Sequence, residues 1–252
     1  MHWRTLSRML RVSALAAGTL LAALGTCGPA FTLAQTPQVT HSVTTAPGLL
    51  RVPNSPTSTT AIGPDRWFDG FALPVIDGDV RAILPWCGGI VIGGRFNQVG
   101  GILTSNIAFW DGVHWHSLAG GTEGEVYCLA EYRGDLIAAG TFESAGDTKA
   151  HNIARWNGSS WTPLGNGLVR QAGSTEVRAL AVHENALIAG GNFDHSGETA
   201  LTAMARWDGH TWLPFGESLD PVLSFCVFRD TLFAGRRTRG AAGSLLMWNG
   251  SA

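Results

Sequence analysis

The chain has 252 residues, enough to bury a large core, yet only 14% of them are charged, against roughly 25% in a typical soluble domain. Glycine (33 residues) and tryptophan (10 residues) are abundant, which suits short strands joined by tight turns. The formal net charge of −2 provides no basic surface, which argues against a nucleic-acid partner.

The N-terminus has the pattern of an export signal. Arg4, Arg8 and Arg11 give a positive start, and residues 12–24 form an apolar stretch that is too short to remain as a membrane-spanning helix. We predict that residues 1–34 form a signal peptide and that the mature chain contains no membrane span. The expected location is therefore secreted, periplasmic or at the surface of a bacterial cell.

Two alternatives for this end stay open. Leu24-Gly25-Thr26-Cys27 resembles a lipoprotein box, in which Cys27 would be acylated, although threonine before the cysteine is a poor match. The apolar stretch would otherwise remain as an uncleaved anchor. In both cases the protein is still exported.

Residues 35–65 contain five prolines among many threonines and serines. Proline cannot donate to a strand ladder, and the polar residues provide no core, so we expect a linker or stalk. Three cysteines follow the signal, at positions that are not equivalent in the repeats described next. We expect Cys128 and Cys226 to fill small core sites.

The region 66–252 repeats a set of landmarks at fixed spacing. A valine is followed sixteen residues later by a phenylalanine, then after fourteen by a tryptophan and after five by another tryptophan. The three copies are Val80, Phe96, Trp110, Trp115; Val126, Phe142, Trp156, Trp161; and Val177, Phe193, Trp207, Trp212. Repeats of this length indicate a propeller or a solenoid.

Each repeat is predicted to contain four short strands, named a to d. Turn residues separate strands a and b, and Asp-Gly or Asn-Gly pairs, a strong hairpin signal, separate strands c and d. Strand a is predicted at 80–86, 126–132, 177–183 and 222–228; strand b at 90–96, 136–142, 187–193 and 232–236; strand c at 107–110, 153–156, 203–207 and 245–248; and strand d at 115–118, 161–164 and 212–215.

Several of these strands are apolar on both faces, so each sheet must be covered on both faces. Radial stacking of the sheets as blades achieves this and also hides most strand edges. A helical solenoid is excluded, because no window of ten residues shows the i, i+3, i+4 apolar pattern. Two small residues, such as Gly93-Gly94, precede each phenylalanine, and this glycine step is expected to let an aromatic ring of the neighbouring blade approach the backbone closely.

The repeat resembles the kelch-type β-propeller repeat. The resemblance rests on the apolar-Gly-Gly step and on the run Ile-Ala-Arg-Trp-Asn-Gly-Ser-Ser-Trp that starts at Ile153. With Gly100, Gly146 and Gly197 included, it is similar to the propeller of fungal cortical-marker proteins and of secreted bacterial proteins. It implies an all-β, kelch-like β-propeller of four-stranded antiparallel blades near 80–118, 126–164, 177–215 and 222–252. It also implies that loops of the propeller bind a protein or a glycan.

The fourth copy departs from the pattern. Gly235-Arg236 replaces the glycine pair, and no strand d follows the last Asn-Gly turn. Phe71–Pro74 would supply the missing outer strand if four blades closed a ring. We favour the alternative, an incomplete ring in a truncated sequence.

No residue pattern predicts a catalytic, cofactor-binding or metal-binding site. His114 and His116 flank Trp115 without a third ligand nearby, and Asp77-Gly78-Asp79 is expected to form a turn. Arg133-Gly134-Asp135 spells an adhesion tripeptide, but its position requires ordinary turn residues. The same applies to the glycosylation sequons at Asn157 and Asn249.

Two further sets of residues were considered for chemistry. Tyr127 and Tyr132 fit core packing better than a copper site of the kelch-related oxidases. Glu123, Glu125 and Glu131 have no predicted partner carboxylate.

The leading hypothesis is therefore an exported, non-catalytic binding or adhesion module that uses its b–c and d–a loops. The alternative is a fragment of a secreted propeller enzyme, an oxidase or a polysaccharide lyase, whose active site lies in missing blades.

Overall fold

The computed structural model describes residues 76–218, 220–238 and 244–250, and these residues form an all-β structure. The signal peptide at 1–34, the linker at 35–65 and the segment Phe71–Pro74 lie outside the described residues. Four antiparallel sheets follow one another along the chain, and we call them blades 1 to 4. Blade 1 contains β1 (Asp79–Trp86), β2 (Gly89–Arg95), β5 (Ile107–Trp110) and β6 (Trp115–Ser117). Blade 2 contains β7 (Val126–Tyr132), β8 (Asp135–Gly140), β11 (Ile153–Trp156) and β12 (Trp161–Pro163).

Blade 3 contains β13 (Glu176–His183), β14 (Ala186–Asn192), β17 (Met204–Trp207) and β18 (Trp212–Pro214). Blade 4 has three described strands, β19 (Val222–Phe228), β20 (Thr231–Arg236) and β21 (Leu245–Met247). Within each blade the strands lie in the order a-b-c-d, as predicted, with ends that differ from the predicted ones by one or two residues.

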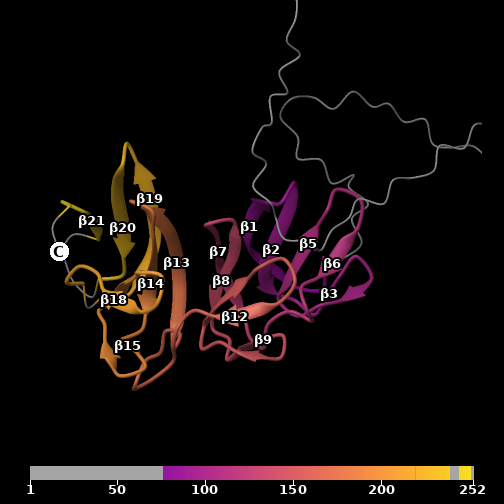
Figure 1. The fold of residues 1–252 in the computed structure, drawn as a ribbon, viewed down its shortest axis with the longest axis horizontal. Coiled ribbons are helices and arrows are strands. Elements are labelled where there is room, and N and C mark those ends of the chain that lie inside the picture. The colour runs from indigo at the N-terminus through magenta and orange to yellow at the C-terminus, as the bar shows by residue number, and fades with distance from the viewer. Residues whose placement is uncertain (1–75, 219, 239–243, 251–252) are drawn as a thin grey trace, which may run out of the picture.

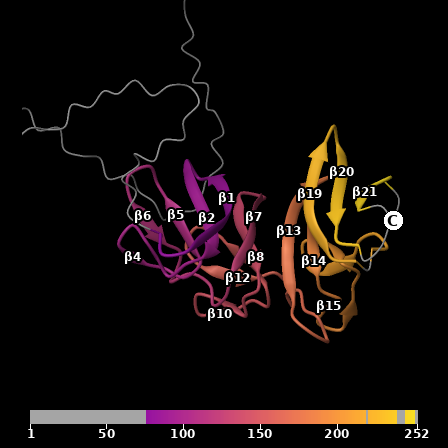
Figure 2. The same cartoon turned by 180° about the vertical axis from the view of Figure 1, so that it is seen from behind.

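The blades stack face to face in an arc. Strand a of each blade lies beside strand a of the next, so that β1, β7, β13 and β19 form the inner side of the arc. Figures 1 and 2 show blades 1 and 4 at opposite ends of the described chain. The arc is an incomplete propeller, and no ring is closed within the described residues.

Buried apolar clusters fill the spaces between the blades. One lies between blades 1 and 2, around Val91, Leu136 and Trp161, and another lies between blades 2 and 3, around Ile137, Leu187 and Trp212. A third, smaller cluster joins blades 3 and 4. Each sheet of the middle blades is thus covered on both faces, as their double-sided apolar strands require.

The glycine step allows this close stacking. A Cβ built on Gly190 would lie 2.7 Å from Val222 Cγ1 and 2.7 Å from Phe225 Cζ of blade 4. The expected approach of an aromatic ring is therefore confirmed at Gly190, but it is wrong at Gly93, where the approaching side chains are the aliphatic Val126 and Leu129. The second glycine has a different role: a Cβ on Gly191 would lie 2.0 Å from the backbone oxygen of Glu176 in the same blade.

Strand a of every blade carries a β-bulge that the repeat pattern did not predict. The register shifts between Val80 and Ala82, Val126 and Cys128, Val177 and Ala179, and Val222 and Ser224. The valine and the residue three positions later, such as Leu129, therefore both face the preceding blade. The skipped residues are Arg81, Tyr127, Arg178 and Leu223.

Candidate functional site

The connections at one end of the blades form a continuous platform, which we call the loop face. It contains the b–c and d–a connections. Each b–c connection of blades 1 to 3 contains a small hairpin, which sequence reasoning treated as a plain loop. The hairpins are β3 (Gln98–Val99) with β4 (Ile102–Leu103), β9 (Ser144–Ala145) with β10 (Thr148–Lys149), and β15 (His195–Ser196) with β16 (Thr199–Ala200).

The glycines at the hairpin turns explain the constant b–c length. Gly100, Gly146 and Gly197 have φ of 63°, 52° and 58°, a conformation that favours glycine. A Cβ on Gly100 would also lie 2.3 Å from Trp115 Cδ1. Each of the first two hairpins packs against the strand-d tryptophan of its blade, so its length cannot vary freely.

Backbone hydrogen bonds tie the first two d–a connections to the hairpin of the next blade. Glu123 N donates to Ser144 O (2.9 Å). At the following junction Val169 N donates to His195 O (2.9 Å), and His195 N donates back to Val169 O (3.0 Å). These two connections, which differ in length, are therefore held in place at the junctions between blades 1 and 2 and between blades 2 and 3.

The loop face carries a cleft of about 740 Å³ between blades 2 and 3. One wall is the end of β10 with Lys149 and His151, and the other is the β15–β16 hairpin. The d–a connection, with Asn166 and Val169, forms the floor. This is the place where sequence reasoning expected binding.

The cleft is lined by one positive and one negative side chain, so its lining has little net charge. Lys149, the only lysine of the chain, and Glu198 are both exposed on opposite walls. His151 Nδ1 lies 3.0 Å from Glu143 Oε2. Amide and hydroxyl groups of Asn166 and Thr199 supply further hydrogen-bonding capacity.

A second group of polar side chains lies on the inner side of the arc, near the start of strand a. The Tyr127 ring lies between two guanidinium groups, with Arg81 5.1 Å and Arg178 4.8 Å from its centroid. Arg81 pairs with Glu125 (3.1 Å) and Arg178 with Glu176 (2.8 Å). Burial raises the pKa of the Tyr127 phenol, and the hydrogen bond to Glu176 raises the pKa of Arg178.

These three stacked residues are the bulge residues of blades 1 to 3. Sequence reasoning missed them because it read strand a as a regular strand. The available signal was the spacing of three, rather than two or four, between the repeated valine and the apolar residue at Ile83, Leu129 and Leu180.

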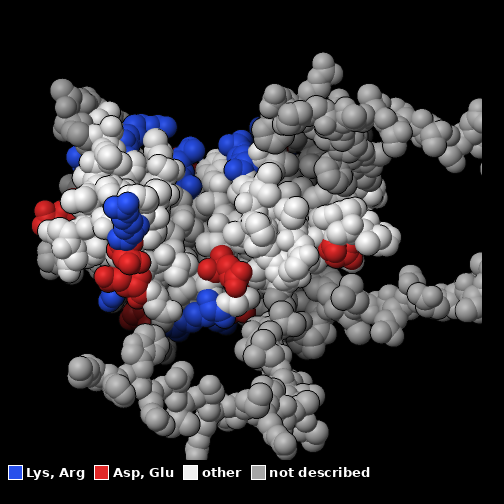
Figure 3. All heavy atoms as spheres, turned by 90° about the horizontal axis from the view of Figure 1, so that it is seen from above, with Lys and Arg blue, Asp and Glu red and all other residues white. Residues whose placement is uncertain are grey.

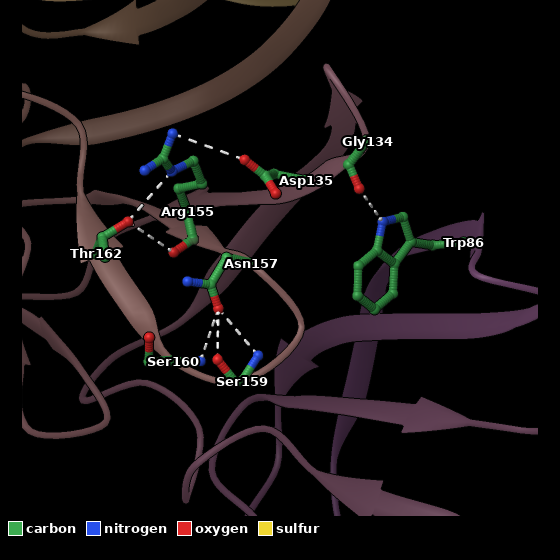
Figure 4. A network of polar contacts seen from close by, with 8 residues as sticks. All are labelled: Trp86, Gly134, Asp135, Arg155, Asn157, Ser159, Ser160 and Thr162. Atoms are coloured by element: carbon green, nitrogen blue, oxygen red, sulfur yellow. Dashed lines mark hydrogen bonds and ion pairs between the residues drawn. The ribbon is translucent and has the colours of Figure 1, made fainter. Parts of the chain in front are cut away.

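The opposite end of the blades, the turn face, holds the adhesion-like tripeptide. Gly134 O accepts a hydrogen bond from Trp86 Nε1 of blade 1 (3.2 Å), and Asp135 lies 3.6 Å from Arg155 (Figure 4). Arg133 has φ of 55°, and its guanidinium stacks over Tyr132 at 5.0 Å. All three residues thus have structural partners within the turn and its neighbours.

Asn157 of the first sequon also has a turn role. Its side-chain oxygen accepts the backbone N–H groups of Ser159 and Ser160, each at 3.0 Å (Figure 4). Asp111 has the same role in blade 1, where Val113 N and His114 N donate to it at 2.7 Å.

The structure does not bring His114 and His116 together as a chelate. The His116 ring pairs with Asp111 at 2.7 Å. The hydrogen bond from His114 N, followed by the His116 contact, lowers the pKa of Asp111. Asp77 accepts Asn97 N (2.7 Å) and Gln98 N (2.8 Å), which lower the pKa of its carboxyl group.

The remaining candidates lie apart from one another. Tyr132 donates to Asn185 O of blade 3 (3.4 Å), far from the stacked environment of Tyr127. Cys128 lies between blades 2 and 3, where burial raises the pKa of its thiol, but the expectation of a core site for Cys226 is wrong because that residue is exposed. Within the described ranges, no group of three or more His, Cys, Asp or Glu side chains is arranged to hold a metal ion.

Charged side chains form small groups of both signs on the surface. In the view of Figure 3 these groups are separated by uncharged surface, and basic side chains lie on either side of the notch at the upper edge. Among residues 76–218, 220–238 and 244–250, no helix has the length and apolar character needed to cross a membrane.

Comparisons with known proteins identify no family. No family model matches the chain, and no curated protein matches it. Among solved structures, the chain is similar to the computationally designed Ika4 protein, with 16% identity and a TM-score of 0.43 over 70% of this chain and 94% of that chain.

Proposed function

We propose that the chain is an exported, non-catalytic binding or adhesion module built on a kelch-like propeller. Its ligand, a protein or a glycan of the cell surface, contacts the loop face. The observation that carries this proposal is the cleft between blades 2 and 3, because it is formed by the b–c and d–a connections.

The construction of the cleft favours binding. Its walls are hairpins with backbone hydrogen bonds across the blade junction, so little conformational entropy is lost when a ligand orders them. Functional side chains on loops that a rigid scaffold holds are a common arrangement in binding modules.

The chemistry of the lining indicates a polar ligand of low net charge. Lys149 and Glu198 offer one group of each sign, and Asn166 offers both a donor and an acceptor. A strongly anionic or cationic ligand would find one of the two charged groups repulsive.

The experiment is a binding screen of the full chain against surface glycans and against envelope proteins. We expect a ligand whose affinity falls about 10-fold or more in Lys149→Ala, since a hydrogen bond to a charged group contributes ~1.5–3 kcal/mol. In Asn166→Ala the affinity should fall roughly 2- to 12-fold, since a hydrogen bond between neutral groups contributes ~0.5–1.5 kcal/mol. Acetylation of Lys149, the only lysine side chain, is expected to have the same effect as Lys149→Ala. The matched control is Arg133→Ala, an exposed cation on the turn face, which should leave the affinity unchanged.

Two results would contradict the proposal. One is a chain that binds no member of either panel. The other is a ligand whose affinity depends on Arg133 and not on Lys149 or Asn166, which would place binding on the turn face.

A further inference from the structure

Blades 2 and 3 also form a second hollow, a groove of about 280 Å³ beside the a–b turn of blade 2. It meets the loop-face cleft at Pro163 and Gly165 but shares none of the charged side chains of that cleft. Its apolar lining includes Leu164 and Trp207. Its polar lining is formed by Arg133, Asp135 and Arg155 of blade 2 and by His210 of blade 3.

Blade 1 fills the equivalent space with apolar side chains. Phe109 occupies the position of Arg155, is 2% exposed, and packs edge-on against Trp86 with the ring centroids 5.9 Å apart. A Cβ built on Gly89, the counterpart of Asp135, would lie 2.6 Å from the Phe109 ring, so this packing requires glycine there. Blade 2 has two charged residues at these positions instead. The loss of apolar packing at a place that the neighbouring repeat fills indicates a role in binding rather than in stability.

The charged groups of the groove leave a positive excess. Arg155 Nε donates to Thr162 Oγ1 (3.2 Å), and one terminal nitrogen of Arg155 lies 3.6 Å from Asp135 (Figure 4). The other terminal nitrogen has no partner among the described residues. Arg133 lies over the Tyr132 ring at 5.0 Å, and within the described ranges it has no carboxylate partner. Two guanidinium groups and one carboxylate therefore line the groove, which favours an anionic ligand.

The groove also offers an apolar wall and a free hydrogen-bond donor. Leu164 is 2% exposed and Trp207 is 8% exposed, so packing fixes both side chains. The strand-c tryptophan has an unused indole N–H in blades 2 and 3: Trp156 Nε1 is buried without an acceptor, and Trp207 Nε1 donates to no described group. Of the two, Trp207 lines the open groove, so a ligand bound there can supply an acceptor.

We propose that this groove binds a small carboxylate with an apolar body, such as an aromatic or alicyclic acid. The carboxylate pairs with the guanidinium groups of Arg155 and Arg133, whose planar arrangement of donors suits carboxylate oxygens. The apolar body contacts Leu164 and Trp207. The volume lies near the lower limit of small-molecule sites, ~300–1,000 Å³, so the ligand is a small molecule and is distinct from the macromolecule proposed for the loop face.

Titration of the purified full chain with benzoate tests this inference. Calorimetry measures the affinity, and the indole N–H signals in ¹H–¹⁵N spectra report the place of binding. We expect benzoate to shift the indole signal that is missing in Trp207→Phe. Arg155→Ala should weaken binding about 10-fold or more, the effect of losing a hydrogen bond to a charged group. The double variant Arg155→Phe with Asp135→Gly copies blade 1, so it should abolish binding while keeping a cooperative urea transition.

The controls separate this site from its surroundings. Arg206→Ala removes the arginine at the same position of blade 3, where Glu184 stands in place of Arg133, and it should leave the affinity for benzoate unchanged. Lys149→Ala should also leave it unchanged, because Lys149 lies in the loop-face cleft. Benzamide, the neutral analogue, should bind about 10-fold or more weakly.

Four results would overturn the proposal. Benzoate could shift no signal of Trp207, or it could bind Arg155→Ala as tightly as the wild type. Sulfate could bind as tightly as benzoate, which would show that the apolar wall contributes nothing. Finally, binding could be lost in Lys149→Ala, which would place benzoate in the loop-face cleft. None of these results bears on the function proposed for the loop face, which the screen with macromolecular ligands tests separately.

Discussion

Gly190→Ala tests whether the glycine step sets the distance between blades. The new methyl group would lie 2.7 Å from Val222 Cγ1 and from Phe225 Cζ, closer than carbon atoms approach in folded proteins. Overpacking lowers the free energy of unfolding by ~1–3 kcal/mol, while the reduced conformational entropy of the unfolded chain raises it by ~0.4–1 kcal/mol. We therefore expect a net loss of about 1–2 kcal/mol in the free energy of unfolding.

The chain itself provides a compensating change. In blade 2 the counterpart of Gly190 is Ala139, and the residue that packs over it is Leu180 rather than a phenylalanine. Phe225→Leu combined with Gly190→Ala reproduces this pair between blades 3 and 4. The double variant should lose about 1 kcal/mol less than the sum of the two single losses, because the residues contact each other.

Urea denaturation followed by tryptophan fluorescence measures these changes. With a slope of about 2 kcal/mol per M, Gly190→Ala should lower the midpoint by roughly 0.5–1 M. A midpoint that rises in Gly190→Ala, or single-variant losses that simply add in the double variant, would refute the reasoning that contact across the blades limits the packing.

Three further predictions concern stability. Gly191→Ala should lower the urea midpoint more than Gly190→Ala does, because the new methyl group meets the fixed backbone oxygen of Glu176 rather than a movable side chain; an equal effect would contradict this. Trp161→Phe should lower the free energy of unfolding by about 1–2 kcal/mol more than Trp115→Phe does. The reason is that Trp161 Nε1 donates to buried Leu118 O (2.8 Å), while Trp115 Nε1 has no acceptor among the described residues. The lowered pKa of Asp111 stabilises the fold above the unfolded pKa of about 4, and this contribution is lost as the pH falls toward the folded value. Asp111→Asn, which copies Asn157 of blade 2, should therefore give a urea midpoint that falls less between about pH 6 and about pH 2 than that of the wild type, and parallel pH profiles would be the contrary result.

The sequence predicted the blades well because their signals are local. The Asp-Gly and Asn-Gly pairs and the repeated tryptophans place strands c and d within one or two residues of the observed β5, β6, β11 and β12. Each signal sits next to the structure that it specifies, and three copies confirm one another.

The features that were missed depend on contacts between distant residues. In blades 1 to 3 the bulge in strand a lies opposite Gly94 and its counterparts, whose missing Cβ lets a backbone oxygen such as that of Asp79 approach, although blade 4 forms the same bulge opposite Arg236. The b–c hairpin is specified by Gly100 against Trp115, fifteen positions away in the chain. The pattern of apolar residues along the sequence does not reveal either of these contacts. The stacked bulge residues Arg81, Tyr127 and Arg178 were therefore not recognised as a group.

The repeats also separate residues that build the scaffold from residues that are free to differ. The valine that precedes each bulge is identical in all four copies, and from blade 2 onward it is fully buried against the preceding blade. The bulge residue beside it is arginine, tyrosine, arginine and leucine in turn, and it lies outside the buried apolar clusters between the blades. The last residue of the b–c hairpin also differs between blades: it is Lys149 in blade 2 and Ala200 in blade 3. Since packing constrains the first class and leaves the second open, recognition of a ligand is expected to depend on positions where the copies disagree, and both the loop face and the inner side of the arc contain such positions.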